Sequence, residues 1–347
     1  MAARELDAVI LFGPENLRYF CGFTGTSGVL LIDRQGQAGF LTDSRYVTQA
    51  EQQVAADRIG EYQQQIDGVI GALEEIAAVN IGFEASLAYS QVEALREKGH
   101  TDWHWSALKD DLKELRVHKS GSEIASIEAA TRLNVTAFSE ILPLIQPGIS
   151  ERELALKLEF ALIERGAEEK AFDFIVASGE RGALPHGVAS DRLLKRGELV
   201  TLDFGCRVNG YHSDETVTLA IGRPPAKLKE IFGLVLAAHD LALEAVQPGV
   251  PLVDIDRIAR EHIEAGGYGD YFGHGLGHGV GLEVHEAPLV SPRSTAIAEE
   301  GMVFTIEPGV YLPGLGGVRI EDMVLVTAGG SRLLTSLPKQ FRDVAAC

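Results

Sequence analysis

Cysteine is scarce in this chain of 347 residues. Its three cysteines, Cys21, Cys206 and Cys347, are odd in number and lie far apart. This pattern excludes a disulfide framework and a thiolate metal site, and it is typical of a reducing compartment. Long hydrophobic runs are also missing, because no stretch approaches the ~18 apolar residues of a membrane span. The charged start, Met-Ala-Ala-Arg-Glu-Leu-Asp, is unlike a signal peptide. These absences predict a cytoplasmic protein.

Positive charge is in short supply. Lysine and arginine number 31 against 50 aspartates and glutamates, which gives a net charge of −19. A protein this acidic repels phosphate groups, so nucleic acid and anionic membranes are excluded as partners. Hydrophobic residues make up 46% of the chain, which is enough for real cores, and the length suggests about two domains.

The domain boundary is predicted between residues 109 and 120, where the chain is rich in charge. Residues 1–115 alternate short strand-like stretches with helical ones, which indicates a separate α/β domain. Strands are expected there at Asp7–Phe12, Gly28–Asp33 and Gly39–Thr42. Residues 116–347 form the second predicted domain.

The second domain carries a duplicated pattern. Ser120 and Glu123 form a capping box, which predicts a helix start. The tripeptide Gln-Pro-Gly ends a helical stretch at residue 146 and again at residue 247, 101 positions later. We expect four helices, over about residues 121–145, 151–165, 227–246 and 250–265. A β-hairpin follows each helix pair, so the repeated unit is helix, helix and hairpin.

The two predicted hairpins carry carboxylates at equivalent places. Residues 197–205 lead to Ser-Asp-Glu at 213–215, and residues 301–309 lead to Ile-Glu-Asp at 320–322. The four equivalent carboxylates are Asp203, Asp214, Glu307 and Glu321. A carboxylate inside an apolar strand is unfavourable unless something neutralises it, so the four indicate a divalent cation site. One structural calcium ion, or pairing with lysine or arginine, is the competing interpretation.

The turn of the first hairpin fixes its register. Asn209-Gly210 is the strongest two-residue hairpin signal in the chain. With this turn Asp203 faces Thr216, and Asp214 lies on the same face because side chains alternate along a strand. Asp203 and Asp214 are then diagonal neighbours, about 7–8 Å apart at the backbone. Their charges repel one another unless a cation lies between them.

Three of the ten histidines lie within twelve residues, between the hairpins. These are His274, His278 and His285, and glycine occupies every second position from 273 to 281. The glycines exclude a stable helix, so His274 and His278 are not a helical zinc pair. Glycine instead lets the backbone approach a ligand or a second strand closely. A phosphate-binding loop is disfavoured because no Lys-Ser/Thr follows. We expect at least one of these histidines to bind a metal.

Residues 116–347 resemble the metallopeptidases of the methionine aminopeptidase, aminopeptidase P and prolidase group, which share the "pita-bread" fold. The resemblance rests on the strings Leu-Asp-Phe-Gly, Ser-Asp-Glu-Thr, Gly-His-Gly-Val-Gly, Val-His-Glu-Ala-Pro, Thr-Ile-Glu-Pro-Gly and Arg-Ile-Glu-Asp. The family orders its ligands Asp, Asp, His, Glu, Glu, and at intervals of 11, 64, 29 and 14 this order is matched by Asp203, Asp214, His278, Glu307 and Glu321. Residues 1–115 resemble the creatinase/prolidase-type domain of the prolidase and aminopeptidase P branch, which methionine aminopeptidases generally lack.

The resemblance implies a two-metal exopeptidase that hydrolyses Xaa-Pro bonds. Asp203 would hold one ion, His278 and Glu307 the other, and Asp214 and Glu321 would bridge them. Carboxylate and imidazole ligands suit Mn²⁺, Co²⁺, Fe²⁺ or Zn²⁺. In such sites a hydroxide that bridges the two ions attacks the peptide carbonyl.

Further roles follow from the same resemblance. Glu307 would also move the proton during catalysis. His186 and His285 match two further family histidines, which act as catalytic hydrogen-bond donors to the substrate. Arg319 would support the substrate-binding side of the site. Relatives with this smaller domain are commonly homodimers, with the N-terminal domain of one subunit near the site of the other, so a homodimer is implied here.

Two departures from the family pattern leave the substrate range open. Val217 and Leu289 stand where relatives often carry arginine. A strict dipeptidase must recognise the free carboxylate of its substrate, so both an Xaa-Pro dipeptidase (prolidase) and an aminopeptidase P acting on longer peptides stay possible. A creatinase-like hydrolase and a non-catalytic binding protein share this fold, but both are expected to lack ligands that this chain retains.

Overall fold

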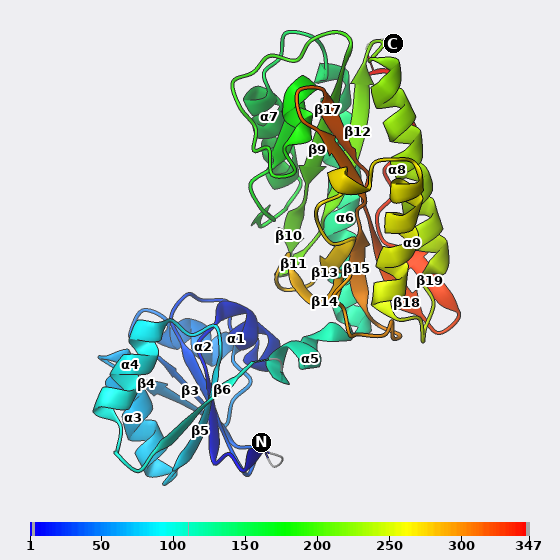
Figure 1. Ribbon diagram of the computed structural model, residues 1–347. Helices are drawn as coiled ribbons and strands as arrows, with labels where there is room; N and C mark the ends of the chain where they lie inside the picture. The colour runs from blue at the N-terminus through cyan, green and yellow to red at the C-terminus, as the bar shows by residue number, and fades with distance from the viewer. Residues whose placement is uncertain (2–3, 110, 345–347) are drawn as a thin grey trace. The chain divides into compact units, whose positions relative to one another are not determined.

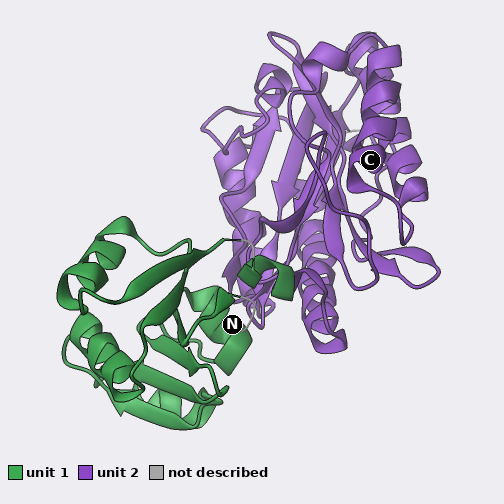
Figure 2. Cartoon of the chain, turned by 60° about the horizontal axis from the view of Figure 1, so that its bottom comes forward, with its two compact units in different colours: residues 1–115 green, residues 116–347 purple. Residues whose placement is uncertain are grey.

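The computed structural model describes residue 1, residues 4–109 and residues 111–344. Cys347 lies outside the described residues, whereas Cys21 and Cys206 are buried free thiols. The chain divides into two compact units, Met1–Leu115 and Arg116–Cys347 (Figure 2). Among the described residues, no helix combines the length and the apolar character that crossing a membrane requires.

Unit 1 contains one six-stranded sheet with helices on both faces (Figure 1). The strand order is β4-β3-β2-β1-β5-β6, and β1–β2 and β2–β3 are antiparallel whereas the other pairs are parallel. Its strands are β1 (Ala8–Leu11), β2 (Val29–Asp33), β3 (Ala38–Thr42), β4 (Arg58–Glu61), β5 (Asn80–Glu84) and β6 (His104–Leu108). Its helices are α1 (Pro14–Cys21), α2 (Val47–Gln53), α3 (Gln65–Glu75) and α4 (Tyr89–Lys98), and α5 (Asp111–Val117) spans the border between the units.

Strand β1 explains why this sheet is covered twice. Ala8 and Ile10 pack with α3 and α4 in one core cluster, whereas Val9 and Leu11 pack with α1 and α2 in another. Consecutive side chains point to opposite faces, so a continuous apolar strand predicts burial on both sides. The three strands expected from the sequence are confirmed to within one residue at each end.

Unit 2 begins with the first helix pair. Helix α6 (Gly121–Ile141) has the expected capping box: Glu123 N–H donates to Ser120 Oγ at 3.4 Å, and Ser120 N–H donates to Glu123 Oε2 at 2.8 Å. Helix α7 (Glu151–Glu164) is capped by Ser150, whose Oγ accepts from Glu153 N–H at 3.0 Å. Short 3-10 helices η2 (Leu142–Leu144) and η3 (Gly179–Ala183) belong to this half.

The first hairpin follows with the predicted register. Strands β9 (Glu198–Phe204) and β12 (Glu215–Ile221) pair with Asp203 opposite Thr216. Asn209 and Gly210 form the turn with positive φ angles of 49° and 77°, the backbone that Asn-Gly favours in two-residue hairpins. The other strands of this half are β7 (Glu169–Lys170), β8 (Ile175–Ser178), β10 (Cys206–Val208) and β11 (Tyr211–His212).

The second half repeats this plan. Helices α8 (Ala226–Ala245) and α9 (Leu252–Ala265) lie side by side, and β15 (Val303–Ile306) pairs with β18 (Asp322–Thr327) (Figure 1). The remaining elements are η4 (Gly269–Tyr271), β13 (Gly277–Gly279), β14 (Glu286–Val290), β16 (Gly309–Leu312), β17 (Gly316–Arg319) and β19 (Gly330–Leu333). Each helix pair packs against the hairpin of its own half, and these contacts form the two largest core clusters of unit 2.

One expectation about the hairpins was too simple. Asp203 lies inside β9, but Asp214 and Glu321 immediately precede β12 and β18, and Glu307 immediately follows β15. Three of the four carboxylates therefore lie at strand ends. A carboxylate oxygen at a strand end can face a shared cavity without interrupting the apolar ladder, which accounts for the difference.

Candidate metal centre

A pocket of about 500 Å³ in unit 2 brings together all the site residues predicted from the sequence. Its lining includes His186, Asp203, Asp214, His278, His285, Glu307, Arg319 and Glu321. These residues come from both halves of the duplication and from the segment between the hairpins. The pocket therefore lies where the two related halves meet.

The carboxylates and one histidine converge at the base of this pocket. Donor atoms of Asp214, His278 and Glu321 all lie within 4.8 Å of one another, as the ligands of one ion would. His278 Nε2 also lies 3.2 Å from Glu307 Oε1 and 3.7 Å from Asp214 Oδ2. Asp203 is only 8% exposed, and no described residue forms a hydrogen bond with its buried Oδ1. This oxygen is available to a ligand that the protein itself does not supply.

Two threonines and an arginine hold these carboxylates in place. Thr216 Oγ1 donates to Glu321 Oε2 at 2.6 Å and accepts from Arg319 Nε at 3.2 Å. Arg319 also donates through Nη2 to Asp203 Oδ2. Thr305 Oγ1 donates to Glu307 Oε1 at 3.2 Å. Such outer hydrogen bonds fix the direction in which ligand oxygens point.

The electrostatics of the cluster favour a cation. Burial and the nearby carboxylates raise the pKa of Asp214 and of Glu321 well above their ordinary values. Burial also raises the pKa of Asp203, although the Arg319 guanidinium opposes this. Burial works against ionisation of Glu307 as well, but its hydrogen bond and its attraction to His278 lower the pKa to about 2. The positive groups of the protein near these four carboxylates do not balance their negative charge. A bound divalent ion would supply the missing positive charge.

The glycine-rich segment places His278 by close backbone packing. His278 is in β13, whose neighbours are β14 and β15. A Cβ atom on Gly277 would lie 1.9 Å from the carbonyl oxygen of Thr305, and one on Gly279 would lie 2.2 Å from that of Ala287. The expectation that glycine admits a second strand here is confirmed, and His278 N–H donates to Thr305 Oγ1 at 3.1 Å as a result.

The other two predicted histidines face the open part of the pocket. His186 and His285 are both exposed, and the His285 ring centroid lies 4.2 Å from that of His278. Partial burial and the charge of His278 lower the pKa of His285, which favours its neutral form. A neutral imidazole beside the carboxylate cluster can donate a hydrogen bond from its N–H to a bound carbonyl oxygen.

One residue of the site was missed by the sequence analysis. Tyr311 lines the pocket, where its hydroxyl accepts from Arg319 Nη1 at 3.1 Å and lies 2.9 Å from His274 Nε2. No motif pointed to this tyrosine. The histidine cluster did include His274, which lines the same pocket and whose ring centroid lies 5.6 Å from that of Tyr311.

A buried lysine lies on the opposite face of the ligand strands. Glu215 and Asp322 directly follow Asp214 and Glu321, so they point away from the pocket. Lys339 Nζ donates to Glu215 Oε1 at 2.7 Å and lies 3.2 Å from Asp322 Oδ1, and all three residues are buried. Burial opposes ionisation of Asp322, but Lys339 and His239 lower its pKa. One ammonium group thus joins the two hairpins behind the carboxylate cluster.

Comparison with known proteins agrees with this architecture. Residues 125–328 match the family model described as metallopeptidase family M24, and residues 1–118 match the creatinase/prolidase N-terminal domain. The Xaa-Pro dipeptidase of Pyrococcus furiosus is 41% identical over 345 residues, which cover 98% of this chain and 97% of that protein.

Solved structures give the same result. The Xaa-Pro dipeptidase from Bacillus anthracis superposes with a TM-score of 0.95 at 42% identity, over 99% of this chain and 96% of that one. The X-Pro aminopeptidase from Thermotoga maritima has a TM-score of 0.89 at 37% identity, over 98% and 97% of the two chains. The predicted fold, a creatinase/prolidase-type α/β domain and a pita-bread domain, is confirmed. The chain belongs to metallopeptidase family M24 and is a prolidase-like metallopeptidase.

Proposed function

We propose that this chain is an Xaa-Pro dipeptidase that uses two divalent metal ions to hydrolyse the bond before proline. The observation that carries the proposal is the convergence of four carboxylates, His278 and two exposed histidines on one pocket. Relatives named Xaa-Pro dipeptidase, at 41% and 42% identity and nearly full coverage, support the substrate class.

The donor set fits two hard or borderline divalent ions. Asp203, Asp214, His278, Glu307 and Glu321 would be the ligands. Carboxylate oxygens with one imidazole suit Mn²⁺, Co²⁺ or Zn²⁺. Asp203 Oδ1, which forms no hydrogen bond with a described residue, is free to bind such an ion. When bound, such ions polarise the substrate carbonyl and make a water molecule acidic enough to act as a nucleophile at neutral pH.

The protein's own groups would then orient the substrate and move protons. His186 and His285, on the exposed side, would donate hydrogen bonds to the substrate carbonyl as negative charge develops on its oxygen. The Glu307 carboxylate, whose Oε1 accepts from Thr305, would receive a proton from the attacking water and return it to the leaving proline nitrogen. Arg319 would act through Asp203, whose carboxylate it orients.

We attribute the proline specificity to a pocket that needs no backbone N–H from the residue after the scissile bond. Proline after the scissile bond has no N–H, so a peptidase that needs that donor rejects it. Imidazole rings and apolar side chains such as Phe172 and Val188 line the outer pocket and can contact the ring without that hydrogen bond.

One observation favours activity on longer peptides as well. Among the described residues that line the pocket, Arg319 is the one lysine or arginine side chain, and it is buried and bonded to Asp203 and Tyr311. Leu289 lines the same pocket and is 61% exposed. The described lining thus offers no uncommitted cation to a free carboxylate, so we propose that Xaa-Pro-Yaa peptides are substrates beside Xaa-Pro dipeptides.

A substrate panel tests the proposed function. We expect kcat/KM to fall at least about tenfold, roughly 1.4 kcal/mol of transition-state stabilisation, when alanine replaces proline in an Xaa-Pro dipeptide. Hydrolysis of the matching Xaa-Pro-Yaa tripeptide should stay within about tenfold of the dipeptide. Equal rates on Xaa-Ala and Xaa-Pro would show that the protein is a general aminopeptidase. A tripeptide that resists cleavage would show that it is a strict dipeptidase.

We also propose that the protein is a cytoplasmic homodimer. The cytoplasmic location rests on the scattered cysteines, of which Cys21 and Cys206 are free.

Helix α7 presents an apolar stripe on its outer face, with Leu156 59%, Phe160 65% and Ile163 43% exposed. Contiguous exposed apolar side chains are typical of interaction surfaces. Light scattering at micromolar concentration should give the mass of two chains, and Phe160→Glu should reduce it. A monomeric wild-type protein with full activity would contradict the dimer.

A further inference from the structure

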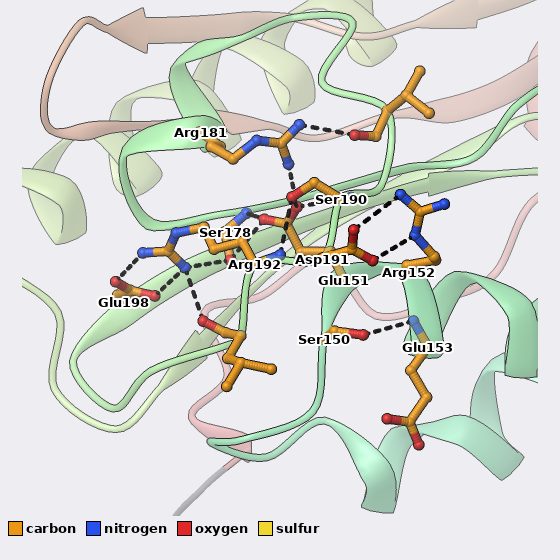
Figure 3. Close-up of polar contacts among 12 residues, drawn as sticks. Ser150, Glu151, Arg152, Glu153, Ser178, Arg181, Ser190, Asp191, Arg192 and Glu198 are labelled. Carbon is orange, nitrogen blue, oxygen red and sulfur yellow. Dashed lines mark hydrogen bonds and ion pairs between the residues drawn. The ribbon is translucent and has the colours of Figure 1, made fainter.

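Glu151, the first residue of α7, is a fully buried carboxylate outside the metal pocket. Five hydrogen-bond donors surround its carboxylate, and Figure 3 shows the residues that supply them. Its Oε1 accepts from Ser178 N–H and Ser178 Oγ, both at 2.8 Å. Its Oε2 accepts from Ser190 N–H at 3.1 Å, from Ser190 Oγ at 2.6 Å and from Arg181 Nη1. A carboxylate can be buried only when donors surround it in this way, and hydrogen bonds to a carboxylate are among the strong ones.

The donors lie on both sides of His186. Arg181 precedes this histidine by five residues and Ser190 follows it by four. Arg181 Nη2 also donates to the carbonyl oxygen of Val188 at 2.8 Å, and Arg152 N–H donates to that of Ser190 at 2.8 Å. The segment 184–189 is therefore a loop whose two ends are fastened to one carboxylate.

Further contacts link this loop to the rest of the site. Arg319 Nη1 donates to the carbonyl oxygen of Pro185 at 3.0 Å, next to His186. Arg192 braces the other side of the network, because its Nη1 donates to Ser178 Oγ at 2.6 Å and to Glu198 Oε2 at 2.9 Å (Figure 3). The His186 side chain is exposed, so its position depends mainly on the backbone that carries it.

We propose that Glu151 is a positioning residue that fixes the loop 184–189 and thereby places His186 against the substrate. This proposal rests on the proposed function, in which His186 contacts the substrate. The carboxylate acts from outside the pocket, through hydrogen bonds to Arg181 and Ser190. A shift of about 1 Å in a positioning loop is enough to lower a rate by about 100-fold.

Glu151→Gln tests this with almost no change in size. Glutamine keeps one acceptor oxygen but places an N–H₂ donor where a carboxylate oxygen accepted. If the amide takes the place of Oε2 it faces three donors, and if it takes the place of Oε1 it faces the Ser178 N–H, so neither orientation restores the network. We expect kcat to fall at least about tenfold, while KM changes less than threefold and metal content stays unchanged. Glu153→Gln is the matched control, since that exposed carboxylate makes no contact in the network (Figure 3).

A double-mutant cycle separates positioning from general damage. If Glu151 acts through His186, then Glu151→Gln should lower kcat little further in a His186→Ala background. Hydrogen exchange of the amides in residues 184–190 should rise in Glu151→Gln and not in Glu153→Gln, which requires no substrate. If Glu151→Gln folds poorly, Ser190→Ala removes one donor and should give the same changes at smaller size.

The failures are distinguishable. Fully additive losses of kcat in the cycle, or unchanged exchange of the loop in both Glu151→Gln and Ser190→Ala, would overturn the positioning role. If the wild-type protein does not cleave Xaa-Pro bonds, the proposed function fails, and increased loop exchange in Glu151→Gln would still support the anchor itself.

Discussion

Replacing Asp214 by alanine should remove the divalent ions and abolish peptidase activity. Asp214 is buried, its donor atom lies within 4.8 Å of those of His278 and Glu321, and in the proposed function it would be one of the metal ligands. Losing an outer hydrogen-bond partner typically lowers metal affinity or activity about 10–100-fold, and losing a direct ligand should do more. We expect kcat/KM to fall by more than about 100-fold.

Metal analysis after gel filtration checks this directly. The wild-type protein should carry about two divalent ions per chain and lose activity to a chelator. Both Asp214→Ala and Glu321→Ala should carry almost none. His285→Ala is the control, because this histidine should act on the substrate: its kcat should fall steeply while its metal content stays normal. Full activity of the Asp214 variant would refute the ligand assignment.

Replacing Lys339 by methionine should destabilise unit 2 by about 3–5 kcal/mol. Methionine fills much of the same space, but the ammonium group that lies between Glu215 and Asp322 is lost. Two buried carboxylates would then lose the ammonium group that contacts both of them, and His239 would contact only Asp322. For a unit of this size the melting temperature should fall by roughly 6–20 °C.

Thermal unfolding of the metal-loaded protein measures this effect. Lys157→Met is the control, because this lysine is 43% exposed and its contact with Glu153 is a surface ion pair. Adding Glu215→Gln to Lys339→Met should restore part of the lost stability, since it removes one of the two repelling charges. Equal melting temperatures for wild type and Lys339→Met would show that the buried ion pairs contribute nothing net.

Local chemistry explains which parts of the fold could be predicted. The Asn209-Gly210 turn fixed the hairpin register because its backbone conformation suits few other residues, and Ser120 with Glu123 marked the start of α6 through contacts three residues apart. The duplicated motifs also predicted which side chains are candidate ligands, and the structure brings them to one pocket.

Other features could not be predicted, because their partners are distant in sequence. Lys339 lies in a short C-terminal segment with no strand or helix signal, more than 100 residues from Glu215. Glu151 was expected only as a helix residue after the Ser150 cap, because its donors lie 27 to 39 residues further on. A lone charged residue in a sequence is predicted to be exposed, and only the tertiary structure shows that it is buried.

The carboxylate cluster lies where the two related halves of unit 2 meet. The thermal stability of the protein should therefore depend on the concentration of free divalent ions. In the proposed function an ion would bind Asp203 and Asp214 from one hairpin and Glu307 and Glu321 from the other, and it could not stay bound after the halves separate. Its binding free energy therefore adds to the folding free energy by mass action, about 2.7 kcal/mol for one site at a free-ion concentration of 100 times Kd. The same protein would then have a higher free energy of unfolding where divalent ions are plentiful than where they are scarce, with no change in its sequence.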